Sequence, residues 1–262
     1  MSQQQATIDV TGVSVEFPRG RRRPPFRALD SVDLAVRPGQ VSCLLGPNGS
    51  GKTTLMNILT GLLTPTSGRL RVLGLDPTAQ RRELLRRIAL VPQETSLYPE
   101  LTARENLAFH ASYYGMPARA QRARIDETLE LVQLGSRARD RAGTFSGGMQ
   151  RRLALGKALM MKPEVLLLDE PTLGVDVQSR EAIWTRIDEV AQEGRIVLLT
   201  TNYMEEAQRL GDQITIIDRG MNVVGGSLSE LTSQVPDVER VEVPAVSLQD
   251  VFLHFTGRGL RN

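Results

Sequence analysis

The chain has 262 residues, of which 40% are hydrophobic, and it carries 32 basic and 30 acidic side chains. This length suffices for one or two domains with a sizeable hydrophobic core. A net charge of +2 does not indicate a nucleic-acid partner, and we predict none. The single cysteine, Cys43, excludes a disulfide framework. No apolar run approaches the roughly 18–20 residues that cross a bilayer, and the first residues lack the features of a signal peptide, so we expect a cytoplasmic location.

The first third of the chain predicts several strands and one helix. Within residues 6–46, polar and apolar residues alternate as in a half-buried strand, and a second such series follows. Prolines in residues 18–25 interrupt this pattern, so we expect a loop there. Residues 41–45 predict a short buried strand, and residues 52–63 have the spacing of an amphipathic helix. The next strands are expected at residues 69–73 and 88–91.

The middle of the chain differs in character from its flanks. Residues 93–162 contain helical patterns and no convincing strand. After them, strands and helices alternate as far as residue 218, which is typical of a mostly parallel sheet covered by helices. Helices are expected at residues 104–114, 122–134, 149–161, 177–192 and 203–210, and strands at 164–169, 195–201 and 213–218. In the tail, a strand is expected at residues 238–243 and a helix at 248–255.

A pattern typical of a phosphate-binding loop follows the strand at residues 41–45. It reads Gly46-Pro47-Asn48-Gly49-Ser50-Gly51-Lys52-Thr53, which fits G-x-x-x-x-G-K-[ST] between a predicted strand and a predicted helix. Glycines let backbone N–H groups curl around phosphate oxygens, and the helix N-terminus adds partial positive charge. We expect Lys52 to reach the β- and γ-phosphates and the hydroxyl of Thr53 to reach Mg²⁺.

Two carboxylates end the apolar strand predicted at residues 164–169. Asp169 and Glu170 follow four apolar residues, and ligands of open α/β sheets bind at the carboxyl ends of strands. Taken alone, an acid pair at a strand end is ordinary. A phosphate loop on the same sheet favours a catalytic interpretation, in which Asp169 binds Mg²⁺ and Glu170 accepts a proton from the attacking water.

A third motif carries a resemblance to a known family. The segment Phe145-Ser146-Gly147-Gly148-Met149-Gln150-Arg151-Arg152 resembles the signature, usually written LSGGQ, of ATP-binding cassette (ABC) transporter nucleotide-binding subunits. A serine and two glycines at a helix start leave N–H donors and a hydroxyl to face an anion, although a plain serine N-cap is the other interpretation. Met149 departs from the family pattern, which has glutamine there. The resemblance implies an α/β fold: a P-loop NTPase core with a mostly parallel sheet and flanking helices, an N-terminal antiparallel β subdomain and a helical insertion subdomain.

The resemblance also implies roles for four residues outside these motifs. Gln93 corresponds to the family's glutamine loop, a sensor of Mg²⁺ and water, and Asp176 to a loop that crosses the dimer interface. Phe17 stands where the family places an aromatic ring against adenine, the alternative being a core residue. Asn202 replaces a family histidine that contacts the γ-phosphate. An asparagine amide can donate a hydrogen bond to phosphate but carries no charge. We therefore expect ATP to bind and turnover to be slower than in family members that have the histidine.

The candidate site residues fall into three groups by expected role. The catalytic candidates are Glu170, Lys52, Gln93 and Asn202. The residues expected to bind ATP are Phe17, Gly46, Pro47, Asn48, Gly49, Ser50, Gly51, Lys52, Thr53, Thr54, Ser146, Gly147, Gly148 and Asp176. The expected Mg²⁺ ligands are Thr53, Gln93 and Asp169.

The resemblance implies a nucleotide-binding domain at residues 6–230, with a helical subdomain at about 93–162, and a short C-terminal extension at 231–262. It implies an ATP-hydrolysing subunit that drives a separate membrane-spanning permease from the cytoplasmic face of the membrane. Residues 93–107 and 247–253 resemble the bacterial multidrug and antibiotic exporter branch. We expect each signature to lie far from its own phosphate loop. The resemblance implies a head-to-tail dimer, a homodimer or a heterodimer, in which two subunits sandwich two ATP molecules.

Three alternatives to an exporter ATPase remain open from the sequence. Asn202 favours a regulatory subunit that binds ATP and hydrolyses it weakly, whereas intact Lys52 and Glu170 oppose it. A soluble ABC ATPase that acts on ribosomes or DNA is less consistent with one uninterrupted cassette and no heptad run. An importer ATPase differs from an exporter only in its partner.

Overall fold

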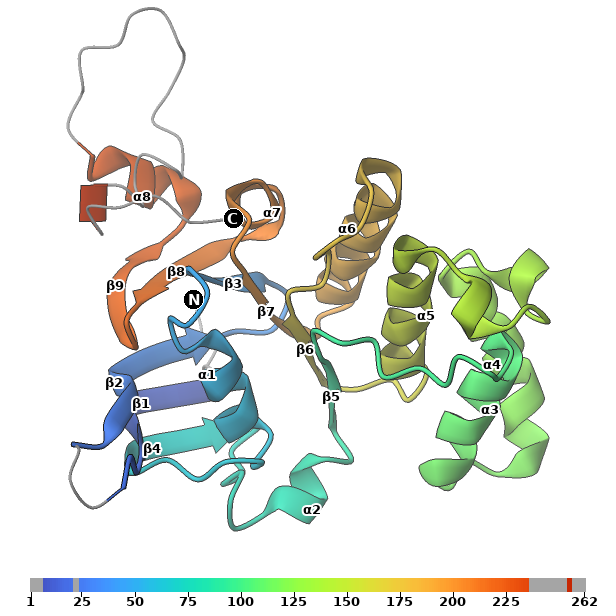
Figure 1. Ribbon diagram of the computed structural model, residues 1–262, viewed down its shortest axis with the longest axis horizontal. Helices are drawn as coiled ribbons and strands as arrows, with labels where there is room; N and C mark the ends of the chain where they lie inside the picture. The colour runs from blue at the N-terminus through green and yellow to red at the C-terminus, as the bar shows by residue number, and fades with distance from the viewer. Residues whose placement is uncertain (1–6, 21–23, 236–253, 256–262) are drawn as a thin grey trace, which may run out of the picture.

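The computed structural model describes residues 7–20, 24–235 and 254–255. Figure 1 shows a small antiparallel sheet at one end, a larger sheet beside it, and a group of helices at the opposite end. The small sheet has the order β2 (Phe26–Val36), β1 (Ile8–Phe17), β4 (Ser67–Val72). The larger sheet has the order β5 (Ile88–Val91), β6 (Val165–Asp169), β7 (Ile196–Thr201), β3 (Val41–Leu45), β8 (Gln213–Asp218), β9 (Met221–Gly226).

The larger sheet is parallel from β5 to β8, and only β9 pairs antiparallel. Its central strands β6, β7 and β3 are buried along their whole length, as runs of apolar residues covered on both faces should be. Along β6, Leu166 and Leu168 join one hydrophobic cluster, while Val165 and Leu167 join another. The sheet therefore separates two cores.

Helices cover both faces of the larger sheet. One core holds α1 (Lys52–Leu59) between the large and the small sheet, because Leu55 and Ile58 of the helix cluster with Ile8 of β1. The other core holds residues of α5 (Gly147–Leu159), α6 (Val177–Gln192) and α7 (Met204–Leu210). This architecture confirms the predicted α/β class.

A separate group of helices consists of α3 (Ala103–Tyr113), α4 (Ala118–Leu131) and α5, with the short 3₁₀ turns η1 (Gly135–Arg137) and η2 (Ala142–Thr144). Leu107, Leu129 and Leu153 belong to its own hydrophobic cluster. Reciprocal hydrogen bonds between Thr102 and Glu105 cap the start of α3. In the described part of the chain, no helix is both long and apolar enough to cross a membrane. The domain limits stay predictions.

Several elements differ from those that the sequence predicts. β9 and the short helices α2 (Arg81–Leu84) and α8 (Leu228–Ser233) were not expected. β9 ends in two glycines and is at most half-buried, so it lacks the apolar alternation that marks a strand. α4 begins at Ala118 rather than at residue 122, and hydrophobic periodicity misses its first turn because residues 118–120 are exposed. α1 stops at Leu59 rather than at residue 63, because Gly61 follows with φ +66° and breaks the helix.

The expected strand at residues 238–243 lies outside the described residues. So does the expected helix at residues 248–255, apart from its last two positions.

Candidate functional site

Three parallel strands bring the phosphate loop and the acid pair to one edge of the sheet. β3 runs beside β7, and β7 beside β6, with Leu45 opposite Thr201 and Asp169 opposite Thr200. The carboxyl ends of these strands therefore meet where residues 46–51 leave β3. This is the edge at which open α/β sheets bind ligands.

Glycines allow the loop to fold tightly against its surroundings. Gly51 has φ +107°, and a Cβ there would lie 2.8 Å from the carbonyl oxygen of Ala28 in β2. A Cβ on Gly46 would lie 2.3 Å from the carbonyl oxygen of Ile217. α1 follows Gly51, which has no side chain to cap the first N–H groups. These donors and the buried Ser50 hydroxyl, which has no hydrogen-bond partner among the described residues, suit an anion.

Lys52 lies at the centre of this loop and is 5% exposed. Its Nζ donates to the carbonyl oxygens of Gly46, at 2.8 Å, and Pro47, at 3.2 Å. It also lies 3.3 Å from Oε1 of Glu170. Burial lowers the pKa of Lys52, while the nearby charge of Glu170 raises it. The ammonium group is thus held by the loop and by the carboxylate that faces it.

Asp169 is held by two hydroxyl groups, one from helix α1 and one from strand β7. Oδ2 accepts a hydrogen bond from Thr53 Oγ1 at 3.1 Å, and Oδ1 accepts a short one from Thr200. Asp169 is 5% exposed, whereas Thr53 is exposed at the first turn of α1. The structure therefore places the Thr53 hydroxyl and the Asp169 carboxylate side by side.

Gln93 and Glu170 meet across 77 positions of sequence, since Gln93 Nε2 donates to Glu170 Oε2 at 3.3 Å. The other carboxylate oxygen faces Lys52. Glu170 has φ +49°, a left-handed conformation unusual for a residue other than glycine. Its N–H donates to the carbonyl oxygen of Thr200 at 3.0 Å. All the predicted catalytic residues except Asn202 are thereby joined by direct contacts.

Asn202 lies across the loop from these residues. Its Nδ2 donates to Oδ1 of Asn48 at 3.4 Å. Its own Oδ1 is buried and has no hydrogen-bond partner in the described part of the chain. The side chain therefore lies near the phosphate loop, and its amide oxygen accepts no hydrogen bond from the described residues.

Phe17 closes β1, pairs with Phe26 of β2 and is 38% exposed, so it is not a core residue. The guanidinium of Arg19 lies 4.6 Å from the ring centroid of Phe26. Two aromatic side chains thus lie where β1 ends and β2 begins, near the β2 residues that pack on Gly51.

The signature residues lie against the end of the loop that precedes α6 and against the first turn of that helix. Ser146 caps α5 by accepting from Met149 N at 3.3 Å, and Gly148 packs so closely on Ser179 that a Cβ would lie 2.4 Å from its Oγ. Asp176 caps α6 by accepting from the N–H of Ser179 at 2.9 Å. Within the residues that the structure describes, no hydrogen bond joins Ser146 or Gly148 to the phosphate loop of the same chain.

The sequence patterns do not reveal Glu206, a buried carboxylate that contacts Thr172 in the loop before α6. Glu206 is 1% exposed, and its Oε1 accepts from Thr172 Oγ1 at 2.7 Å and from Trp184 Nε1 at 3.0 Å. Burial raises the pKa of Glu206. Because Glu206 follows another glutamate in a helix that reads as amphipathic, its sequence context resembles that of a surface acid.

Comparisons with known proteins agree with this geometry. The ABC transporter family model matches residues 29–173. Nod factor export ATP-binding protein I of Cupriavidus metallidurans is 42% identical over 216 residues, which cover 82% of this chain and 71% of that protein. Linearmycin resistance ATP-binding protein LnrL of Bacillus subtilis is 39% identical over 225 residues, covering 86% and 72%.

Solved structures are similar over most of the chain. An ATP-binding subunit of an ABC transporter, 26% identical, has a TM-score of 0.80 and covers 95% of this chain and 99% of its own. A dimeric ATP-binding cassette in a post-hydrolysis state with ADP and Pi, 28% identical, has a TM-score of 0.76 and covers 84% and 98%. Together with the phosphate-loop geometry, these matches show that the chain belongs to the ABC transporter family and is an ATPase, the ATP-binding subunit of such a transporter.

Proposed function

We propose that this subunit powers export through a separate membrane-spanning permease, and that two ATPase subunits close around the nucleotide. The contact of Glu170 with both Lys52 and Gln93 carries the catalytic part of this proposal. The names of the relatives, which refer to Nod factor export and linearmycin resistance, support export.

In the proposed reaction, Lys52 leaves Glu170 and the loop carbonyls and binds the β- and γ-phosphates of ATP. The water oxygen attacks the γ-phosphorus, the bond to the bridging oxygen of ADP breaks, and the water proton passes to the Glu170 carboxylate. Gln93, which donates to Glu170 before ATP arrives, orients that water. Asn202 donates its amide to the γ-phosphate in place of Asn48.

The oxygen atoms near the loop fit Mg²⁺, which prefers carboxylate, hydroxyl and phosphate oxygens. Thr53 Oγ1 and Asp169 Oδ2 are 3.1 Å apart and belong to residues on the same edge of the sheet. We propose these two residues and the amide oxygen of Gln93 as its ligands. When bound, the ion would neutralise charge on the β- and γ-phosphates.

The position of the signature supports a dimer. Ser146 and Gly148 lie against the start of α6 rather than against their own phosphate loop, so a nucleotide that they contact would have to be bound by another chain. In the proposed head-to-tail dimer, Ser146, Gly147, Gly148 and Asp176 of one subunit complete the site of the other. The aromatic pair at Phe17 would stack on adenine, which is worth about 1–3 kcal/mol.

A groove between the sheet and the helical group supports docking of a permease. It has a volume of about 790 Å³ and runs from the loop after β5 to α3 and α5. Tyr98, Phe109, Tyr113 and Tyr114 line it and are exposed. We place the permease contact here, next to Gln93, which would locate the subunit on the cytoplasmic face of the membrane.

Hydrolysis measured across protein concentrations tests the dimer. We expect the rate per chain to rise from nanomolar to micromolar protein, because half of each site comes from a partner. A flat rate would contradict obligate pairing. Capture of a membrane protein by this subunit, followed by ATP-dependent efflux from inverted vesicles, tests the exporter assignment. A single-turnover assay tests the alternative of a weakly hydrolysing subunit, which the contacts of Lys52 and Glu170 do not favour.

A further inference from the structure

Arg151 is a buried cation, 4% exposed, whose five N–H groups all donate to main-chain carbonyls. The acceptors are the carbonyl oxygens of Pro92 (2.6 Å), Gln93 (3.0 Å), Asp169 (2.7 Å), Glu170 (2.9 Å) and Pro171 (2.7 Å). Burial lowers the pKa of Arg151, and the nearby carboxylates of Glu206, Asp169 and Glu170 raise it. A guanidinium saturated in this way has no donor left for a nucleotide.

These carbonyls belong to two segments that leave the sheet at neighbouring points. β5 and β6 pair as far as Val91 and Leu168, and beyond this pair the segments 92–93 and 169–171 no longer bond to each other as strands. Buried carbonyls without partners destabilise a fold. Arg151 joins the two segments where the strand pairing ends.

The two segments carry side chains that we assign to hydrolysis. Gln93 and Glu170 meet through their side chains, and Arg151 bonds to the carbonyl oxygen of each. The left-handed backbone at Glu170 is strained and persists only under outside restraint. That restraint comes from Thr200 on the N–H side and from Arg151 on the carbonyl side.

The same side chain connects this region to the signature. Arg151 lies in α5, five positions after Ser146, which caps the helix. A displacement of α5 would therefore be transmitted directly to the main chain at Gln93 and Glu170. ATP is expected to touch Lys52 and Thr53, and neither of these residues bonds to Arg151.

We propose that Arg151 is a positioning residue for ATP hydrolysis: it fixes the main chain at Gln93 and Glu170 so that their side chains face the attacking water. This inference rests on the proposed roles of Glu170 and Gln93. It separates turnover from binding by the phosphate loop. Arg151 bonds to the main chain of Gln93, Asp169 and Glu170, which we assign to the water and the Mg²⁺, and to no residue of the loop at 46–53.

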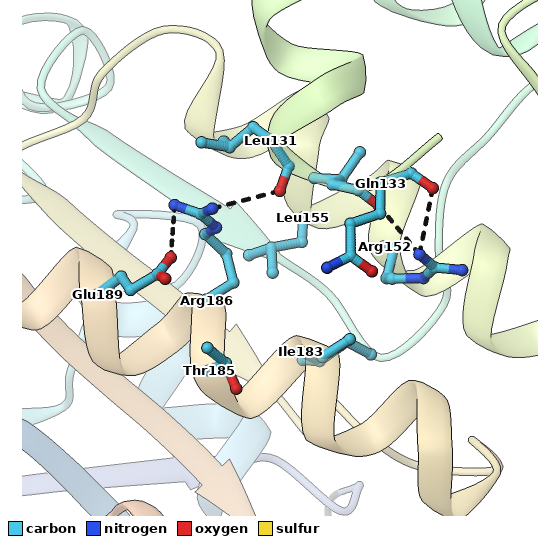
Figure 2. A pocket seen from close by; sticks show the side chains of 10 residues that line it. Leu131, Gln133, Arg152, Leu155, Ile183, Thr185, Arg186 and Glu189 are labelled. Carbon is cyan, nitrogen blue, oxygen red and sulfur yellow. Dashed lines mark hydrogen bonds and ion pairs between the residues drawn. The ribbon is translucent and has the colours of Figure 1, made fainter. Parts of the chain in front are cut away.

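The test compares Arg151→Lys with Arg152→Lys in the full chain. Lysine keeps the charge at position 151 but has three donors at one nitrogen rather than five in a planar fork, so it cannot bond to all five carbonyls. The control, Arg152, donates instead to the carbonyls of Val132 and Gln133 at 3.2 and 3.4 Å, beside a small pocket between α4, α5 and α6 (Figure 2). Calorimetry gives the ATP affinity and the fraction of active sites, and single-turnover assays give the rate per active site.

We expect Arg151→Lys to lower the rate per active site at least tenfold, while the Kd for ATP, measured without added Mg²⁺, changes less than twofold. Arg152→Lys should change neither. If Arg151→Lys is poorly folded, Arg151→Ala with added methylguanidinium replaces it, and the rate should recover with the additive at unchanged Kd.

An unchanged rate per active site, or a rate and an affinity that fall together, would assign Arg151 a purely structural role. Recovery of folding by methylguanidinium without recovery of the rate would do the same. A Glu170→Gln variant that hydrolyses ATP at the wild-type rate would instead refute the proposed role of Glu170, on which this inference rests.

Discussion

The ion pair between Lys52 and Glu170 predicts that Glu170→Gln has opposite effects on hydrolysis and on ATP binding. In the protein without nucleotide, Glu170 Oε1 lies 3.3 Å from Lys52 Nζ, and both side chains are buried. ATP must take the ammonium group away from this carboxylate. The carboxylate then faces the negatively charged γ-phosphate. Its charge therefore weakens ATP binding in two ways: it holds Lys52 in the empty site, and it repels the phosphate in the occupied one.

The distance sets the scale of this effect. Two unit charges 3.3 Å apart attract by about 5 kcal/mol at an effective dielectric constant of about 20. Desolvation of two buried charges offsets most of this attraction. We expect a net gain on the order of 1–2 kcal/mol in ATP binding for Glu170→Gln, which is roughly tenfold in Kd. Loss of the general base should slow hydrolysis by about 10²- to 10⁴-fold.

Calorimetric titration with ATP and a single-turnover assay measure the two effects separately. Glu164→Gln is the matched control, because Glu164 pairs with Arg87 on the surface, at 2.6 and 2.8 Å, away from the loop. It should change neither the affinity nor the rate. If Glu170→Gln binds ATP no more tightly than the wild type, the Lys52 pair does not oppose binding and this reasoning is wrong. A rate within threefold of wild type would remove Glu170 as the base.

Two further predictions follow from single side chains. Asn202→His should raise the single-turnover rate at similar ATP affinity, because an imidazole can carry charge at the γ-phosphate; equal rates would show that the replacement of the family histidine does not limit turnover. Burial, and to a lesser extent the charge of Lys157, lowers the pKa of His110 from 6.5 to about 4. The folded state therefore binds fewer protons than the unfolded chain between these values, so stability falls as the pH drops from about 6.5 to about 4. Since the ring is partly exposed, we expect roughly 1–3 kcal/mol from this group. Urea unfolding at pH 4.5 and pH 7 should show a smaller difference for His110→Asn than for wild type, and an equal difference would contradict the lowered pKa.

The sequence alone determined those features that depend on local chain geometry. The phosphate-loop pattern is specific only between a strand and a helix, and in that context its glycines and Lys52 indicate phosphate binding. The buried strand that ends in Asp169 was evident for the same reason, since a run of apolar residues closed by acids is unambiguous beside such a loop. The α/β order of elements followed from hydrophobic periodicity, which failed at β9, where the strand is half-exposed and glycine-rich.

Only the tertiary structure decided how distant segments meet. The contact of Gln93 with Glu170 spans 77 positions, and resemblance to a family suggested a shared role but not a hydrogen bond. Arg151 reads as an ordinary helical arginine, and Glu206 as a surface acid. Each owes its environment to main-chain carbonyls or side chains from other elements. A carbonyl is common to every residue, so no pattern of side chains can reveal which one a buried arginine will bind.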